Sequence, residues 1–179
     1  MKTNVRKTVL MGMLCAISVV LVSAIRLPFP AAPFLEYDPA DIPIILGTFL
    51  LGPLSGLAIT VVVSILQGII FSSSSGIIGI IMHIFATGFY VVAVGLISKL
   101  KTKHSSIIAV IVGTFVMTAA MVVWNMIFTP IFMKQPFEVV KAMILPIIVP
   151  FNLMKAGING ALALIIYYVV KKIYKKDCQ

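Results

Sequence analysis

The sequence predicts an all-α integral membrane protein with six transmembrane helices and with both termini in the cytoplasm. Of its 179 residues, 61% are hydrophobic and only 11% are charged, whereas soluble domains carry about 25% charged residues. The mean hydropathy is +1.17. The apolar residues form runs that are long enough to cross a bilayer as helices, and basic residues cluster beside those runs.

The formal net charge of +9 does not indicate nucleic-acid binding. The basic residues flank apolar segments, where they set the orientation of a membrane protein and meet anionic lipid headgroups. The two cysteines, Cys15 and Cys178, have no neighbour at a redox or metal-ligand spacing, so we expect neither a disulfide framework nor a metal site. No small-residue cleavage site follows the first apolar run, which we therefore expect to stay as a helix.

We expect one membrane domain over residues 1–179, crossed by six helices. The spans are predicted near residues 8–25, 40–51, 54–71, 76–98, 105–128 and 147–170. Arg26 and a proline-rich stretch end the first span, and the basic residues of 99–103 end the fourth. Loops at 72–75 and 129–141 separate other spans, and a basic tail follows the last.

The apolar run over 42–71 is longer than the ~20 residues that one span needs. Gly52 and Pro53 lie inside it, and proline disfavours helix at the residue before it. We therefore divide the run into two spans, although one long span is the alternative. Ten of the fourteen basic residues lie in three clusters, at the N-terminus, at 99–103 and in the tail. Only the division places all three in the cytoplasm, as the positive-inside rule requires.

The acidic residues concentrate in one short stretch, 34–41, after the first span. It holds Glu36, Asp38 and Asp41, three of the five acidic residues. Carboxylates beside a membrane segment are costly unless solvated or paired, so they mark a candidate functional site. A polar loop that merely links two helices is the alternative.

The last predicted helix carries three polar residues on one face. Asn152, Lys155 and Asn159 are spaced i, i+3 and i+7. Such a face is costly in lipid and should turn towards the bundle interior or a water-filled pocket. Trp124 and Asn125 lie at a similar depth near the outer end of the preceding helix. These residues and the acidic stretch together predict an outward-open ligand pocket, mostly apolar with a few orienting polar groups.

The same residues also fit purely structural roles. The asparagines can bond across helices as structural contacts, with Lys155 snorkelling or pairing with Asp38 or Asp41. Trp124 can act as an interfacial anchor. We expect His83 and Gln67, which are single polar residues within spans, to form interhelical hydrogen bonds.

No motif for enzymatic chemistry is found. His83 has no serine or cysteine nucleophile at a motif spacing, and the chain lacks the Gly-x-x-x-x-Gly-Lys-Ser/Thr phosphate loop. We therefore expect no enzyme, and uphill transport would need energy from another chain or an ion gradient.

Small residues recur along one side of the first predicted helix. Gly12 and Ala16 are four residues apart, and Val20 and Ala24 follow at the same spacing. This spacing allows close approach of another helix, which belongs either to this chain or to a separate subunit.

Two stretches carry a family resemblance: EYDPADIP over residues 36–43 and LGPLSG over residues 51–56, with Gly47 between them. Together with Asn125, Asn152 and Lys155, and with the size and order of the spans, they resemble the substrate-binding (S) components of energy-coupling factor (ECF) transporters. The riboflavin-specific S components are the most similar group.

The resemblance implies a high-affinity riboflavin-binding subunit in a bacterial cell membrane, with FMN as a further candidate ligand and with no cofactor. It implies partners: a transmembrane coupling protein that packs on Gly12, Ala16 and Val20, and two ATP-binding subunits that hydrolyse ATP. The residues expected to bind the vitamin are Leu35, Glu36, Tyr37, Trp124, Asn125, Asn152, Lys155 and Asn159. Tyr37 or Trp124 would stack on the flavin ring, and the amides and Lys155 would meet its polar groups.

Two rival functions remain at this point. One is an S component for folate, thiamine or pantothenate, although a single cation deep in a span, Lys155, favours an uncharged ligand. The other is a non-transporting membrane scaffold whose polar face binds a partner helix.

Overall fold

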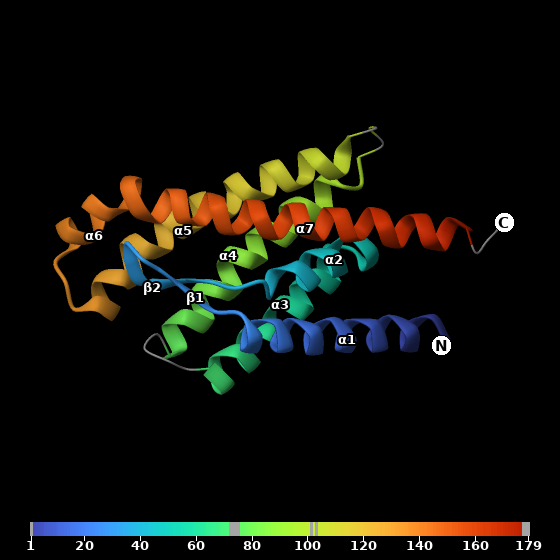
Figure 1. Cartoon of the computed structure of the whole chain (residues 1–179), viewed down its shortest axis with the longest axis horizontal. Helices are drawn as coiled ribbons and strands as arrows, with labels where there is room; N and C mark the ends of the chain where they lie inside the picture. The colour runs from blue at the N-terminus through green and yellow to red at the C-terminus, as the bar shows by residue number, and fades with distance from the viewer. Residues whose placement is uncertain (1, 72–75, 101, 103, 177–179) are drawn as a thin grey trace.

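The computed structural model describes residues 2–71, 76–100, 102 and 104–176. Its elements, drawn in Figure 1, are the helices α1 (Lys2–Ala24), α2 (Asp41–Leu51), α3 (Pro53–Phe71), α4 (Gly76–Ile97), α5 (Ser105–Met133), α6 (Phe137–Met143) and α7 (Val149–Lys176), the strands β1 (Leu27–Phe29) and β2 (Ala32–Tyr37), and a π-helical turn, Ile144–Ile148. The chain is mostly helical, as predicted.

Five segments of the described chain are helical, long and apolar enough to cross a membrane. They are Val5–Ala24, Pro53–Phe71, Gly76–Ile97, Ser105–Met133 and Phe137–Ile173. The remaining predicted span, 40–51, corresponds to α2, which has only 11 residues. The helices extend beyond the predicted spans at three places, because α1 begins at Lys2, α5 continues past residue 128 to Met133, and α7 continues past residue 170 to Lys176.

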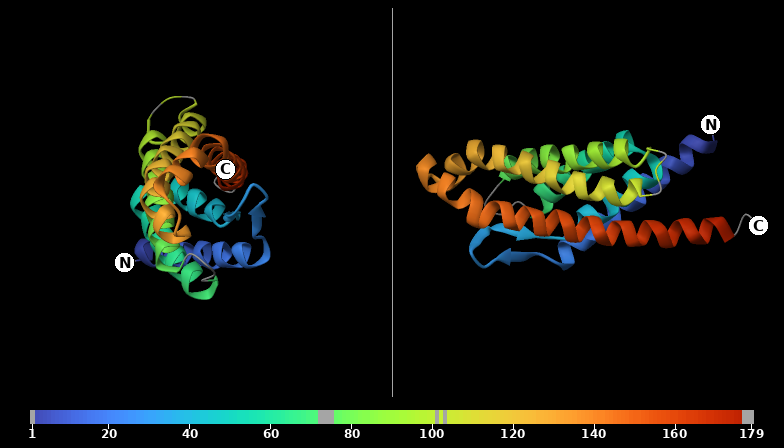
Figure 2. Two further views of the ribbon diagram at one scale, coloured as in Figure 1. Left: turned by 90° about the vertical axis from the view of Figure 1, so that its left-hand side faces the viewer. Right: turned by 90° about the horizontal axis from the view of Figure 1, so that it is seen from above.

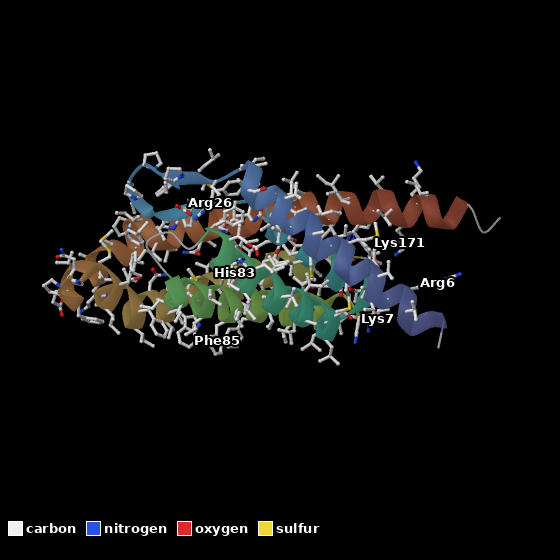
Figure 3. The ribbon with its side chains drawn as sticks, turned by 90° about the horizontal axis from the view of Figure 1, so that it is seen from below. Arg6, Lys7, Arg26, His83, Phe85 and Lys171 are labelled. Atoms are coloured by element: carbon white, nitrogen blue, oxygen red, sulfur yellow. The ribbon has the colours of Figure 1, made fainter. Side chains whose placement is uncertain are left out.

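The two ends of the chain lie at the same end of the helix bundle (Figure 1). The end of α4 and the start of α5 also lie there, whereas the β-hairpin and α6 lie towards the opposite end. Arg6, Lys7 and Lys171 mark the end that holds the termini (Figure 3). The labelled basic residues of α1 and α7 therefore lie at one end of the molecule, and the hairpin that carries Glu36 lies towards the other end.

The prediction of an all-α fold is wrong between α1 and α2, where the chain forms a β-hairpin. Strands β1 and β2 pair antiparallel, with Leu27 opposite Tyr37 and Pro28 opposite Glu36. Prolines in this stretch argued against a strand, because proline cannot donate to a sheet ladder. In a two-stranded ribbon, however, each strand has a free edge, so prolines whose missing N–H faces outward are tolerated.

The predicted loop at 129–141 is largely helical. Helix α5 continues through Pro130 and ends at Met133, and its C-cap Lys134 has a left-handed backbone with φ 51°. After the three-residue link 134–136, α6 and the π-helical turn lead directly into α7. The other predicted loop, at 72–75, lies outside the described residues.

Helix α2 lies inside the bundle between α1 and α7 (Figure 2) and also contacts α3 and α4. Its Ile44 and Ile45 are fully buried. Gly52, with φ +90°, allows the sharp turn that folds α3 back along α2. The two helices approach closely at Gly56, where an added Cβ would lie 2.1 Å from Thr48 Oγ1. Packing against the neighbouring helices therefore fixes the position of α2, which is shorter than a typical membrane span.

Candidate functional site

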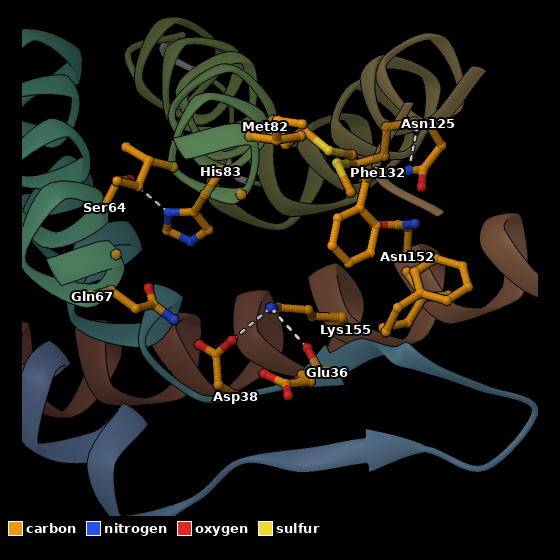
Figure 4. Close-up of a pocket in the computed structure, with 18 of the residues that line it drawn as sticks. Glu36, Asp38, Ser64, Gln67, Met82, His83, Asn125, Phe132, Asn152 and Lys155 are labelled. Atoms are coloured by element: carbon orange, nitrogen blue, oxygen red, sulfur yellow. Dashed lines mark hydrogen bonds and ion pairs between the residues drawn. The ribbon is translucent and has the colours of Figure 1, made fainter. Parts of the chain in front are cut away.

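A pocket lies in the half of the bundle that carries the hairpin, enclosed by β2, α3, α4, α5 and α7 (Figure 4). Its volume, including the open mouth, is about 1100 Å³. The polar residues that line it are Arg26, Glu36, Asp38, Ser64, Gln67, His83, Asn125, Thr129, Asn152 and Lys155. Its apolar walls include Phe34, Leu35, Phe71, Met82, Met117, Met121, Phe132 and Phe151. This combination of apolar walls with a few convergent polar groups is typical of a small-molecule site.

The polar face of α7 is turned inward, as its spacing predicted. Asn152, Lys155 and Asn159 are all at most 8% exposed. Lys155 Nζ donates to Asp38 Oδ2 at 2.7 Å and to the Glu36 carbonyl oxygen at 3.2 Å (Figure 4). Asn159 Nδ2 donates to the Asp38 carbonyl oxygen at 2.9 Å. The face therefore holds the end of the hairpin against α7, and its Asn152 and Lys155 also line the pocket.

Three residues that we predicted as ligand contacts lie outside the pocket lining: Tyr37, Asn159 and Trp124. The Tyr37 hydroxyl donates to Asn159 Oδ1 at 3.0 Å, so these two residues bond to each other. Burial, and then the nearby charge of Asp38, raises the pKa of Tyr37, which keeps its phenol a hydrogen-bond donor at neutral pH. Both residues support the hairpin from behind the pocket.

Trp124 packs in an aromatic group on α4 and α5. Its ring centroid lies 4.6 Å from that of Phe85 and 5.4 Å from that of Phe128. Phe85 is 44% exposed on the outside of the bundle. Asn125, the next residue in the chain, points into the pocket instead (Figure 4). Neighbours in sequence on α5 thus face opposite sides of the helix wall.

Two buried amides, Asn125 and Asn152, face the pocket from different helices (Figure 4). Asn125 Nδ2 donates to the Met121 carbonyl oxygen at 2.7 Å, and Asn152 Nδ2 donates to the Ile148 carbonyl oxygen at 2.8 Å. Because an amide nitrogen carries two donors, each of these bonds uses only one. The bonds fix the orientation of both amides without exhausting their capacity to bind a ligand.

His83 joins three helices, which confirms the expected interhelical hydrogen bond. Its Nδ1 lies 2.6 Å from Ser64 Oγ on α3, and its Nε2 lies 3.2 Å from Asp41 Oδ1 on α2. Thr87 Oγ1 donates to the same Asp41 oxygen at 3.1 Å. His83 also lines the pocket, a role that we did not predict.

Gln67 also lines the pocket, and the interhelical bond that we expected of it is not seen at its carbonyl oxygen. Gln67 Oε1 is buried, and among the described residues it has no hydrogen-bond partner. Ser64, Gln67 and Phe71 are spaced i, i+3 and i+7 along α3, so they share one helix face. That spacing was the available signal for a second polar face on the site.

Three carboxylates face basic side chains around the pocket. Lys155 pairs with Asp38 at 2.7 Å, and His83 lies 3.2 Å from Asp41. Arg26, just after the end of α1, pairs with Glu36 on β2. Arg26 also donates to the Phe71 carbonyl oxygen at 3.4 Å and lies over the Phe71 ring, 5.7 Å from its centroid. Glu36 and Asp38 of the acidic stretch are therefore paired with cations, and Asp41 is hydrogen-bonded to His83, so the stretch is not a plain solvated loop.

The stripe of small residues on α1 faces away from the rest of the chain. Gly12, Ala16 and Val20 are all exposed. A Cβ added at Gly12 would have no other side chain within 4 Å. The spacing allowed a partner helix from this chain or from a separate subunit, and among the residues that the structure describes no other helix packs on the stripe at Gly12.

Known proteins match nearly the whole chain. A family model described as the substrate-specific component of ECF transporters matches residues 6–167. The riboflavin transporter FmnP of Bacillus subtilis is 28% identical over 94% of this chain and 93% of its own length. The riboflavin transporter RibU of Streptococcus thermophilus is 28% identical over 97% of this chain and 87% of its own length.

The fold agrees with a solved S component of a bacterial ECF transporter. The TM-score is 0.81 at 26% sequence identity, with 96% of this chain and 99% of the other covered. This chain belongs to the ECF transporter family as a substrate-specific component, a multi-pass membrane subunit for transport rather than an enzyme.

Proposed function

We propose that this chain binds riboflavin in the pocket between the hairpin and α7 and mediates its uptake together with an ECF energy-coupling module. The observation that carries the proposal is the pocket itself. Buried amides and a lysine face phenylalanine and methionine walls, in a chain that is similar over nearly its whole length to riboflavin transporters.

The lining suits both parts of this vitamin. The flavin ring needs an apolar slot, which Phe71, Phe132 and Phe151 offer in place of the Tyr37 and Trp124 faces that we first expected. The ring carbonyls and ribityl hydroxyls need donors and acceptors, and Asn125 and Asn152 supply both. A site built in this way penalises ligands without matching hydroxyls, because buried polar groups would lose their partners.

We propose the finer topology on the same basis. The termini and the start of α5 share one end of the bundle (Figure 1), and the basic clusters lie along it. The positive-inside rule assigns that end to the cytoplasm. Counting α2 as a short sixth span then gives six spans with both termini inside, and the pocket opens to the exterior.

The proposed partners follow from what the chain lacks and from what it exposes. No phosphate-loop motif occurs in the sequence, so two ATP-binding subunits would supply the energy. A transmembrane coupling protein would pack on the exposed small residues Gly12, Ala16 and Val20 of α1. Riboflavin is cargo in this scheme rather than a cofactor, and FMN is a second candidate ligand.

The test is a titration of the detergent-purified protein with riboflavin, followed by tryptophan emission. The protein is produced without riboflavin, and Trp124 is its single tryptophan. Trp124 lies one residue from the pocket residue Asn125, which is close enough for energy transfer to a bound flavin. We expect saturable quenching at sub-micromolar riboflavin with one site per chain.

A free tryptophan derivative titrated in parallel removes the absorbance of the flavin from the signal. Thiamine, folate and pantothenate, tested by thermal shift on the same preparation, cover the rival vitamins. If riboflavin does not quench the folded protein but one of these vitamins raises its melting temperature, that vitamin would replace riboflavin as the proposed cargo.

A further inference from the structure

The charges of the pocket bear on which form of the ligand it accepts. We propose that Glu36 determines specificity: by pairing with Arg26 at the pocket mouth, it makes the site favour the uncharged vitamin over its phosphate ester. This inference rests on riboflavin being the ligand.

The first support is the balance of charge. The basic side chains in the described lining are Arg26, His83 and Lys155. Each of them faces one carboxylate, from Glu36, Asp41 and Asp38 respectively. Arg26 and Lys155 are cations at neutral pH, whereas a histidine is charged only when it is protonated, so the carboxylates at least balance the cations. A phosphate monoester carries between one and two negative charges near neutral pH. Such a ligand would have to draw one cation away from its carboxylate.

Burial decides which cation can change partner. The side chains of Lys155 and Asp38 are 11% and 6% exposed, and releasing Lys155 would leave a buried carboxylate unpaired, which is the costly way to break an ion pair. Asp41, the partner of His83, is 3% exposed. Arg26 and Glu36 are 28% and 35% exposed. The pair at the mouth is therefore the one that exchanges partners at the lowest cost.

Arg26 has the chemistry and the position to take a phosphate. Its planar guanidinium presents several donors that match phosphate oxygens. Contacts to the Phe71 carbonyl oxygen and ring hold it between the hairpin and α3 independently of Glu36. Removing the charge of Glu36 would thus leave the guanidinium in place at the mouth, while removing its competitor and a group that repels phosphate.

The alternative is that the Arg26–Glu36 pair only holds the end of α1 against the hairpin; we call this role a latch, and the specificity role a charge filter. The two roles differ in what they predict. Loss of a latch would weaken the binding of both ligands alike, because both need the closed hairpin. Loss of a charge filter would change the ratio of the two affinities.

The experiment measures the dissociation constants of riboflavin and FMN for Glu36→Gln, Glu36→Asp and the unchanged protein. We expect Glu36→Gln to lower the ratio of the FMN to the riboflavin dissociation constant about tenfold, which is the effect expected of one partly screened charge. In this variant, FMN binding should become weaker as the salt concentration rises. Glu36→Asp keeps the charge and should keep the ratio. Arg26→Gln should lower FMN affinity more than riboflavin affinity.

Glu138→Gln is the matched control, because it makes the same change of charge at an exposed ion pair on α6, away from the pocket lining. It should leave both constants unchanged. An unaltered ratio in Glu36→Gln, or an equal loss of both ligands, would overturn the inference in favour of the latch. If the unsubstituted protein binds neither riboflavin nor FMN, that result would instead refute riboflavin as the cargo.

Discussion

Helices α1 and α7 each carry a stripe of distinctive residues at helical spacing, but the stripes face in opposite directions. On α7, Asn152, Lys155 and Asn159 are buried. On α1, Gly12 and Ala16 are exposed. The difference has a physical cause: polar groups in lipid need partners, whereas small apolar residues need none. Spacing identifies a face, and the chemistry of the face decides whether it must be buried.

The two stripes also differ in how strongly they are tied to the fold. Lys155 and Asn159 together donate three hydrogen bonds to the end of the hairpin, at Glu36 and Asp38. Binding and stability are thus coupled on α7, because the same side chain lines the pocket and anchors the hairpin. Gly12, Ala16 and Val20 of α1 are exposed, and no such hydrogen bond is found at them in the described part of the chain, so changes there should leave the isolated subunit intact.

The largest effect is expected from Lys155→Met. Removing one partner of a buried ion pair costs about 3–5 kcal/mol, since Asp38 would remain buried with its charge. We expect both lost riboflavin binding and a melting temperature lower by an amount on the order of 10 °C in detergent.

The double variant Asp38→Asn with Lys155→Met separates the causes of that loss. It removes the stranded charge and should recover much of the melting temperature while binding stays weak. Equal stability of Lys155→Met and the unchanged protein would mean that the pair does not anchor the hairpin.

A smaller and more selective effect is expected from Asn152→Leu. The amide donates to the π-helical turn directly before its helix, at the Ile148 carbonyl oxygen, whereas Lys155 and Asn159 hold the hairpin. Loss of its contacts to the vitamin should weaken riboflavin binding by about 10–100-fold, from ~1–3 kcal/mol. Titration calorimetry gives the affinity, and a thermal melt checks the fold.

Met154→Leu is the matched control for this variant. Met154 lies on the same helix, is 39% exposed and does not line the pocket. The Met154→Leu protein should therefore bind riboflavin with the affinity of the unchanged protein. Similar affinities for both variants would remove Asn152 from the site.

The features that the sequence revealed are those with a strong energetic requirement. The transmembrane helices were predictable from the long apolar runs, because backbone N–H and C=O groups in lipid must be hydrogen-bonded within the protein. The buried face of α7 was predictable because Asn152 and Lys155 would be costly in lipid without partners. The pairing of Lys155 with Asp38 was one of the alternatives that the composition already offered.

The features that the sequence concealed have two different causes. The hairpin pairs neighbours in the sequence, such as Pro28 with Glu36, but prolines on both strands are atypical of a sheet and hide the pairing. His83 and Gln67 were treated as single polar residues, since only the packing of α3 against α4, which is not visible in the sequence, brings them to one pocket.

The smallest effect on the isolated subunit is expected from Gly12→Leu, which nevertheless tests the outward stripe. A Cβ at Gly12 meets open space, so riboflavin affinity should stay within about twofold and the melting temperature should not fall. A large side chain would, however, prevent close approach of a partner helix, which needs small residues at the contact. We expect the variant to lose co-purification with a co-expressed coupling module.

Gly157→Leu makes the same change on α7, at a position where an added Cβ also meets open space. If the stripe on α1 is the docking face, this variant should fold, bind riboflavin and assemble normally, because it adds bulk on the helix whose working face is turned inward. Assembly of Gly12→Leu as complete as that of Gly157→Leu would place the coupling contact elsewhere. Loss of assembly in both variants would mean that the partner covers α7 as well as α1. The chemistry of the residues would then have predicted the buried face of α7 correctly, but not the docking face on α1.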